Sequence, residues 1–472
     1  MRKRLINLRI PVDPPGEDGL DTAPVDILIE GERIAAVTPP GERPSEADEL
    51  RIDLGDRLVL PGAIDGHVHF DDPGFTYREN FETGTRSAAG GGVTCIVDMP
   101  CTSLPPVTSR PNLEAKLAVI APKAHVDFML WGGVSANAME EPDWIANLED
   151  VVSEGVGAIK VYMLSGMDTF RDLDDTSLEA VLRETRRLGV PVGVHAEDRR
   201  MVLRLTDRLV SEGRDAPLDY AASRPAAGEV AAVSTLRELC RRTGARVHVV
   251  HVAAGEALEV ITAARDEGLP LSGETCPHFL AFTEDDLASQ GALLKTAPVV
   301  KTAADRERLW AGIAGGEIQH VATDHAAGEW PAEKHTGSIW TDYGGVPGVE
   351  LLLPYLYSEG YREGRITLNR LVELVSTAPA RFFGVEARKG HIAAGFDADL
   401  AVIDEGDSWS VRAAEMHNLN RYTPFEGRTL AGRVTATFVR GTSVFSRSAD
   451  GAESFGPAGF GQRIRRETRM SA

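Results

Sequence analysis

The sequence predicts an α/β fold: a (β/α)8 TIM barrel with a small β-sandwich domain formed from both chain ends. From about residue 55 onwards, apolar runs alternate with segments of helical periodicity, which is typical of βα units around a parallel sheet. Eight such runs over about 320 residues fit the usual size of a TIM barrel. Short strand-like segments bounded by turn residues precede and follow this region, which indicates a separate β domain.

The N-terminal part of the small domain is expected over residues 1–54. Two apolar segments, 25–30 and 33–37, flank Gly31 and Glu32, and this spacing predicts a hairpin with a tight turn. Its C-terminal part is expected over 386–445, with strands at 398–403, 432–439 and 442–445. Residues 446–472 are rich in Ser, Gly and Arg, which predicts a peripheral tail.

The barrel is expected over residues 55–385. Its first strand is the apolar run 57–64, which leads into His67 and His69. The other strands are expected at 92–98, 126–131, 157–162, 190–195, 246–251, 270–274 and 320–324. Helices are expected at 112–121, 175–188, 229–242, 254–266, 302–314 and 369–376. A doubly wound open sheet is the alternative, but such sheets more often carry a glycine-rich phosphate loop after the first strand, and none is present.

Composition argues against several classes of function. The net charge of −21 over 472 residues disfavours a binding surface for nucleic acid or anionic lipid. Four cysteines without a CxxC pair indicate neither a disulfide framework nor a thiolate metal site. The basic start MRKRLINLRIPV lacks the apolar core of a signal peptide, and no run reaches the ~18 apolar residues of a membrane span. We therefore expect a cytoplasmic protein that binds neither nucleic acid nor a membrane.

Residues with metal-binding side chains lie at the ends of the predicted strands, where the active site of a TIM barrel is found. His67 and His69 are two residues apart, so both imidazoles point the same way. His195, His251 and Asp324 end the fifth, sixth and eighth strands. Each alone is compatible with a core histidine or a helix cap, but together they predict a metal centre.

Lys160 belongs to the same group and lies within the fourth strand, between Ile159 and Val161. A lysine buried there is unfavourable unless it is paired or modified. Burial beside cations would depress its pKa and free the amine for chemistry. The alternative is that its long stem lets the ammonium reach the rim of the barrel.

Longer motifs contain or flank these residues: GHVHFDDPG (66–74), ETGTRSAAGGGVTCIVDMP (82–100), HAED (195–198), ETCPHFL (274–280), ATDHA (322–326) and KGHIAAGFDADLAVID (389–404). They resemble the amidohydrolase superfamily, and within it the cyclic-amide hydrolases, which comprise allantoinases, hydantoinases or dihydropyrimidinases, and dihydroorotases. The similarity extends from about residue 25 to residue 440. It implies hydrolysis of a ring amide in a small cyclic ureide or imide.

The resemblance also implies a site for two divalent metal ions, most often zinc, with a carbamylated Lys160 between them. The implied ligands of the first ion are His67, His69 and Asp324, and those of the second are His195 and His251. Asp324 would act first as a base towards water and then as an acid towards the leaving nitrogen. Family members commonly form dimers or tetramers, so we expect a homo-oligomer.

His248 lies close to the implied ligand His251, but residues three apart face opposite sides of a strand. Only one of the two is therefore expected to point into the barrel. The family pattern favours His251, and a structural role is expected for His248.

The side chains expected around the substrate favour an allantoinase-like activity. Dihydroorotases usually carry an arginine directly after the HxH-aromatic segment, to bind a substrate carboxylate, whereas this chain has Asp71. Hydantoinases place a tyrosine five residues after the bridging lysine, where this chain has Ser165. Asp71 and Ser165 are candidate hydrogen-bond partners of an allantoin-like ring, and Tyr162 is a candidate to stabilise the oxyanion. For Asp71 the alternative is a solvated loop.

Other activities remain as alternatives. DMPCTSLPPVT (98–108) and WGGV (131–134) are allantoinase-like, but the segment 357–384 resembles a hydantoinase, so hydantoinase or dihydropyrimidinase activity is the first alternative and dihydroorotase activity the second. A scaffold relative would lack metal ligands, and all six positions are filled here. A deaminase of the superfamily would typically hold one metal and lack Lys160.

Overall fold

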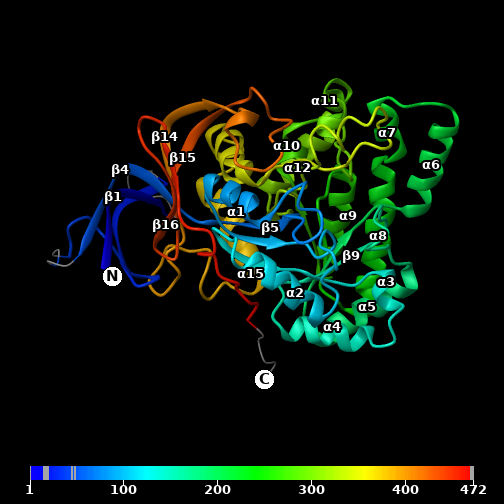
Figure 1. Ribbon diagram of the computed structural model, residues 1–472, viewed down its shortest axis with the longest axis horizontal. Coiled ribbons are helices and arrows are strands. Elements are labelled where there is room, and N and C mark those ends of the chain that lie inside the picture. The colour runs from blue at the N-terminus through cyan, green and yellow to red at the C-terminus, as the bar shows by residue number, and fades with distance from the viewer. Residues whose placement is uncertain (1, 14–20, 44–45, 47–48, 468–472) are drawn as a thin grey trace.

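Parallel strands form a barrel with helices around it, beside a sheet built from both chain ends (Figure 1). The computed structural model describes residues 2–13, 21–43, 46 and 49–467. The barrel strands pair in parallel within two groups, β5-β6-β7 and β8 to β13. A parallel bridge between Val68 and His325 joins the end of the first strand to the segment just after the last strand. The predicted TIM barrel with a separate β domain is confirmed.

The barrel strands are β5 (Ala63–Val68), β6 (Val93–Asp98), β7 (Asp127–Leu130), β8 (Gly132–Gly133), β9 (Ile159–Tyr162), β10 (Val192–His195), β11 (Val247–Val249), β12 (Leu271–Thr275) and β13 (His320–Val321). The strands predicted from 92–98 onwards lie where they were expected. Two of them, β11 and β13, end earlier than predicted, and this difference matters at the functional site.

The longer helices are α1 (Phe81–Gly90), α2 (Arg110–Ile120), α4 (Trp144–Ser153), α5 (Asp175–Leu188), α6 (Arg199–Ser211), α8 (Ala226–Thr243), α9 (Gly255–Asp266) and α12 (Ala303–Ala314). The helix α5 shows why such segments form. The Asp174 carboxylate accepts the N–H of Ser177 at its start, and Gly189 ends it with φ of 71°. Between these caps, Leu178, Val181 and Leu182 are buried against the barrel.

Shorter helical elements complete the molecule: α3 (Ala136–Met139), α7 (Pro217–Ser223), α10 (Pro277–Ala281), α11 (Glu284–Gln290), η1 (Gly291–Leu294), η2 (Val349–Leu351), α13 (Leu352–Tyr355), η3 (Leu356–Arg362), α14 (Leu368–Val372), η4 (Glu373–Thr377), α15 (Ala378–Phe383) and η5 (Ala413–Glu415). The predicted helix 369–376 is therefore α14 continued by η4, which has the wider π-helical turn. None of the helices in the described part of the chain is both long enough and apolar enough to cross a membrane.

The predicted strand 57–64 is wrong in one respect, because this apolar run is divided between two sheets. Its first part belongs to β4 (Leu50–Pro61), which pairs with β1 and β14, and its last residues open β5. At Gly62, between the two strands, a Cβ atom would lie 2.2 Å from the Thr94 hydroxyl oxygen, so only glycine fits. The terminal sheet therefore includes residues 55–61, beyond the limit expected at residue 54.

The terminal sheet has the strand order β17-β16-β15-β14-β4-β1-β2-β3. Its other strands are β1 (Arg2–Pro11), β2 (Thr22–Glu30), β3 (Arg33–Thr38), β14 (Leu400–Ser410), β15 (Thr429–Val439), β16 (Thr442–Arg447) and β17 (Glu453–Phe455). The predicted hairpin is β2-β3. The expected β-sandwich takes the form of one continuous hydrogen-bonded sheet with its own apolar cluster, which includes Leu5, Ile27, Leu400 and Phe438.

Parts of the tail expected over 446–472 contact the rest of the molecule, and residues 468–472 lie outside the described residues. The strand β17 adds to the edge of the terminal sheet. Further on, the buried Ile464 donates its backbone N–H to the carbonyl of Phe128 in β7, over 2.8 Å. The tail thus extends the pairing of the barrel strand β7.

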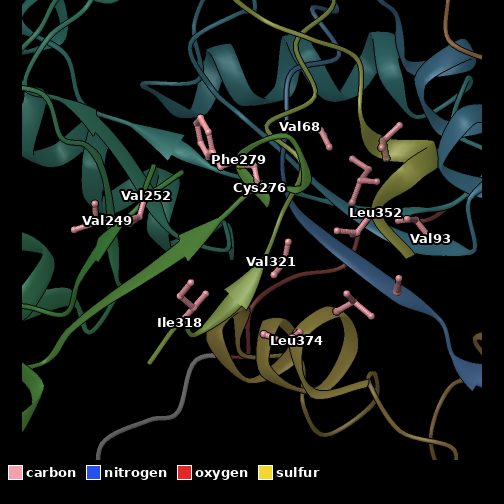
Figure 2. Packing of buried hydrophobic residues seen from close by; sticks show 14 of the residues in the cluster. Val68, Val93, Val249, Val252, Cys276, Phe279, Ile318, Val321, Leu352 and Leu374 are labelled. Carbon is pink, nitrogen blue, oxygen red and sulfur yellow. The ribbon is translucent and has the colours of Figure 1, made fainter. Parts of the chain in front are cut away.

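One large apolar core fills the space between the barrel strands and the outer helices (Figure 2). Val249 and Val321 belong to the barrel strands, and Leu374 of η4 packs beneath β13. Parallel barrel strands are buried on both faces, which explains why they appear in the sequence as continuous apolar runs. This packing fixes the strand ends that carry the functional site.

Candidate metal centre

Side chains from the first and last barrel strands meet at the rim formed by the carboxyl ends of the strands. His67 and His69 lie at and just after the end of β5, and Asp324 follows β13. The Nε2 atoms of His67 and His69 lie 3.1 and 3.2 Å from the same Oδ1 atom of Asp324. One ligand atom from each of the three residues lies within 4.8 Å of the others, so together they could hold one divalent ion.

His195 and His251 form a second pair beside this group. The Nδ1 atom of His195 lies 3.1 Å from Nε2 of His251, and the ring centroids of His251 and His67 are 5.5 Å apart. His251 and Asp324 lie beyond the ends of β11 and β13, with φ of 45° and 49°. Left-handed backbone at residues other than glycine is uncommon and often marks a functional site. The residues predicted from separate strands therefore converge.

His248 also points into the barrel, so the expectation that His248 and His251 face opposite sides is wrong. The strand β11 ends at Val249, and the left-handed turn at His251 breaks the alternation of side chains. His248 lies one layer deeper than His251. Its ring stacks on that of His320, with centroids 5.0 Å apart, and its Nε2 atom lies 3.2 Å from Glu274.

Lys160 is fully buried in β9, and its Nζ atom has no hydrogen-bond partner among the described residues. This atom lies 4.7 Å from the centre of the Tyr162 ring. Because the whole residue is buried, the side chain does not extend to solvent. Burial lowers the pKa of Lys160, which favours the neutral amine. In the same part of the site, Nδ1 of His251 is also buried, and none of the described residues forms a hydrogen bond with it. Unpartnered nitrogens beside histidines and a carboxylate fit a site for divalent metal ions.

Glu274 of β12 holds His67 from behind and was missed in the sequence. Its Oε1 atom lies 2.7 Å from Nδ1 of His67, while Oε2 contacts Nε2 of His248 and His320 at 3.2 and 2.9 Å. Burial alone would raise the pKa of Glu274, but hydrogen bonds from the three histidines hold it well below its usual range. An ionised carboxylate on Nδ1 leaves Nε2 of His67 free to bind a metal.

Glu197 supports His195 in the same way on the other side of the site. Its Oε2 atom lies 2.8 Å from Nε2 of His195, and Arg224 forms an ion pair with the same oxygen. Burial lowers the pKa of His195, which keeps the ring neutral and able to donate a lone pair from Nδ1. The HAED motif in the sequence contains both residues, but it did not indicate that Glu197 orients His195.

A pocket of about 520 Å³ opens above these residues. Its floor is formed by the five groups His67, His69, His195, His251 and Asp324. Its walls are largely apolar or aromatic, from residues that include Phe75, Leu164, Met167, Leu203 and Trp340. A concave, mostly apolar pocket with a few convergent polar groups is the usual form of a small-molecule site.

Two of the three predicted substrate contacts, Tyr162 and Ser165, line this pocket, and Asp71 does not. Asp71 is completely buried with φ of 55°, and burial raises its pKa well above its usual range. It lies in neither a solvated loop nor the pocket wall. The hydroxyl of Ser165 donates to the carbonyl of Phe170 over 2.7 Å, so it shapes the adjoining loop. Tyr162 stacks on His195, with ring centroids 5.2 Å apart.

Arg78 supplies a cation in the pocket that the sequence did not reveal. It is held by Glu333, whose carboxylate oxygens lie 3.0 and 2.8 Å from Nε, and it lies over the ring of Tyr343 at 4.4 Å. Arg78 is in the loop after β5, whereas Glu333 and Tyr343 come from the long loop after β13. Only the closed barrel brings these loops together, so no local sequence pattern could indicate the pair.

The barrel with a rim of histidines, an aspartate and a buried lysine defines the class of metal-dependent hydrolases. The Amidohydrolase family model matches residues 58–444. Allantoinase from Rubrobacter xylanophilus is 38% identical over 444 residues, which cover 94% of each chain. Allantoinase from Streptomyces avermitilis is 37% identical and covers 90% of this chain and 92% of its own.

Solved structures of the same group superpose closely. L-hydantoinase (dihydropyrimidinase) from Arthrobacter aurescens has a TM-score of 0.91, 30% sequence identity, and covers 98% of this chain and 99% of its own. Dihydropyrimidinase from Brevibacillus agri has a TM-score of 0.90 and 31% identity over 99% of both chains. The chain belongs to the amidohydrolase family, in its cyclic-amide hydrolase group, and is a hydrolase that acts on C–N bonds.

Proposed function

We propose that the protein opens the ring of a cyclic ureide by hydrolysing a ring amide, with allantoin as its preferred substrate. The observation that supports this most strongly is the convergence of His67, His69 and Asp324 within 4.8 Å, beneath a pocket of about 520 Å³. The similarity to allantoinases over 94% of the chain selects allantoin among the cyclic amides. The proposed substrate is a small molecule, and a pocket of about 520 Å³ is in the usual size range for such a ligand.

The proposed cofactor is a pair of divalent ions, zinc by preference, and a carbamylated Lys160 would serve as a further ligand. His67, His69 and Asp324 would hold one ion, and His195 with His251 the other. When bound, the ions supply Lewis acidity, which lowers the pKa of water and polarises a carbonyl. The buried, unpartnered Nζ of Lys160 supports the carbamate, because a neutral amine can react with carbon dioxide.

Asp324 is the proposed catalytic residue. Burial alone would raise its pKa, but contacts with His67 and His69 hold it well below its usual range, so the carboxylate is ionised at neutral pH. It can therefore accept a proton from the attacking water and pass it to the leaving ring nitrogen. Burial raises the pKa of Tyr162 well above its usual range, so this phenol stays protonated and can donate to the developing oxyanion.

A hydantoinase or dihydropyrimidinase activity is the second candidate. The apolar side chains Leu164, Met167 and Leu203 line a pocket larger than an unsubstituted ring needs, and they suit an apolar substituent. The hydantoinase structures with TM-scores of about 0.9 share this chain's whole fold. Arg78 favours neither candidate, because Glu333 already neutralises it.

A hydrolysis panel decides between these activities. Metal-replete protein is assayed with allantoin, hydantoin, dihydrouracil, dihydroorotate and a simple cyclic imide. We expect the highest kcat/KM for allantoin, by at least ~10-fold over hydantoin, because unpaired polar groups in the site penalise the simpler ring. A higher kcat/KM for hydantoin or dihydrouracil would select the second candidate, and no ring opening with any of them would overturn both.

We also propose the domain limits, the cellular location and the oligomeric state of the enzyme. We expected the barrel domain at 55–385 and the small domain at 1–54 with 386–445. Because β4 pairs within the terminal sheet up to Pro61, we place the small domain at 1–61 with 386–445 and the barrel domain at 62–385. A cytoplasmic location and a dimer or tetramer complete the proposal. Gel filtration with light scattering would measure the oligomeric state.

A further inference from the structure

Tyr343, in the long loop after β13, lines the wall of the pocket above the metal centre. It is half-buried, and no described residue forms a hydrogen bond with its hydroxyl group. The hydroxyl of a tyrosine away from open solvent usually has a hydrogen-bond partner. Burial raises the pKa of Tyr343 well above its usual range, so the hydroxyl stays protonated at neutral pH. It is therefore available as a donor to a bound ligand.

The aromatic ring of Tyr343 is fixed along one edge and one face. A Cβ atom at Gly328 would lie 2.8 Å from its Cδ1 atom, and one at Gly345 would lie 2.9 Å from its Cε1 atom, so the edge of the ring packs closely on both glycines. The guanidinium group of Arg78 lies 4.4 Å from the centre of the ring. These contacts hold the ring and do not involve the hydroxyl.

Two buried lysines hold the backbone around Tyr343. The Nζ atom of Lys334 donates to the carbonyls of Tyr343 and Gly345, over 3.0 and 2.8 Å. The Nζ atom of Lys295 donates to the carbonyl of Asp342, directly before Tyr343. A side chain whose ring and backbone are both held loses little conformational freedom when a ligand binds, which favours specific recognition.

Other polar side chains in the pocket wall already have partners within the protein. The hydroxyl of Ser165 donates to a backbone carbonyl, as described above. Glu333 neutralises Arg78, and Glu197 forms an ion pair with Arg224. Much of the remaining wall is apolar or aromatic. A polar substituent on a substrate ring therefore needs a donor that the protein does not itself occupy, and the Tyr343 hydroxyl is such a donor.

We propose that Tyr343 is a specificity-determining residue, whose hydroxyl donates a hydrogen bond to the ureido carbonyl of allantoin. This inference rests on the proposed function and names the group by which the site would distinguish allantoin from hydantoin. The ring amide must lie at the metal centre on the floor of the pocket, whereas Tyr343 belongs to the wall, where a substituent of the ring can reach it. Hydantoin lacks the ureido substituent, so with that substrate the hydroxyl gains no such partner.

The variant Tyr343→Phe tests this assignment in metal-replete protein, with allantoin and hydantoin as substrates. Phenylalanine keeps the ring on which Arg78 lies and removes only the hydroxyl. We expect kcat/KM to fall by about 10-fold for allantoin and to change by less than about 2-fold for hydantoin. Tyr357→Phe is the matched control, because the buried hydroxyl of Tyr357 contacts Glu405 and Tyr357 does not line the pocket. We expect the control to leave both values unchanged.

An unchanged kcat/KM for allantoin would overturn the inference, and so would equal losses for the two substrates, because the hydroxyl would then not act on the ureido group. Wild-type protein that opens neither ring would instead contradict the proposed function. In that case, calorimetric titration of allantoin into metal-replete Asp324→Asn and Asp324→Asn/Tyr343→Phe still tests Tyr343, because binding needs no turnover. We expect about 10-fold weaker binding by the double variant. Equal affinities, or no binding by either protein, would overturn the inference.

Discussion

Among single residues, Lys160 and Asp324 matter most for the proposed chemistry of the site. Lys160 is buried and has no hydrogen-bond partner in the part of the chain that the structure describes, which is unfavourable for an ammonium and acceptable for a modified or metal-linked amine. One carboxylate oxygen of Asp324, Oδ1, contacts both His67 and His69. The sequence could indicate these residues because each lies at or near the end of a predicted strand.

The variant Asp324→Asn separates the contribution of Asp324 to metal binding from its contribution to proton transfer. The amide keeps an oxygen of similar position but cannot accept the proton of the attacking water. We expect kcat to fall by about 10²- to 10⁴-fold while most of the bound metal remains. Steady-state kinetics and metal analysis of the same preparation measure both quantities. Turnover close to that of the wild type would remove Asp324 from its proposed role.

Glu274→Gln tests the layer beneath the metal centre. The neutral amide cannot hold Nδ1 of His67 as strongly as the carboxylate does, so the orientation of His67 becomes less fixed. We expect metal affinity to fall about 10- to 100-fold, with the fold retained. Competition with a chelator measures the affinity, and circular dichroism monitors the fold. Unchanged affinity would show that Glu274 only fills space.

At the scale of elements, the ends of β11 and β13 decide the geometry of the site. Both strands stop short of their predicted ends, and the left-handed residues His251 and Asp324 follow. Strand alternation alone therefore gave the wrong orientation for His248. Such a turn is stabilised by the surrounding barrel and has no local signature, because neither residue is a glycine.

His417 links the loop after β14 to two other elements and predicts a pH dependence of stability. Burial alone would lower its pKa, but hydrogen bonds to Glu350 and Glu453 raise it to about 9, from 6.5. A raised pKa in the folded state stabilises the protein fully below pH 6.5, and this contribution is lost as the pH rises through 9.

We therefore expect His417→Gln to lower the free energy of unfolding by about 1–3 kcal/mol at pH 6 and by much less at pH 10. Urea denaturation of the variant and the wild type at both pH values measures the difference, and other titrating groups cancel in that comparison. An equal loss at the two pH values would show that the charge of His417 is not involved.

At the scale of the whole molecule, the sequence predicted the barrel, the β domain from both ends and most of the metal centre. It did so because buried parallel strands leave apolar runs and because the active site of such a barrel lies at one rim. It did not predict the change of sheet at Gly62, which depends on the close approach of Thr94. It also missed Arg78 and Glu274, whose partners lie far away along the chain.

The number of metal ions bound per chain tests whether the rim of the barrel holds a two-metal centre. Protein purified after growth with added zinc is analysed by inductively coupled plasma mass spectrometry, beside the variant Lys160→Ala. We expect two divalent ions per wild-type chain, loss of metal in Lys160→Ala, and recovery when a short carboxylic acid replaces the missing carbamate. A wild-type chain without bound metal, or a variant with full metal content and no need of the acid, would contradict it.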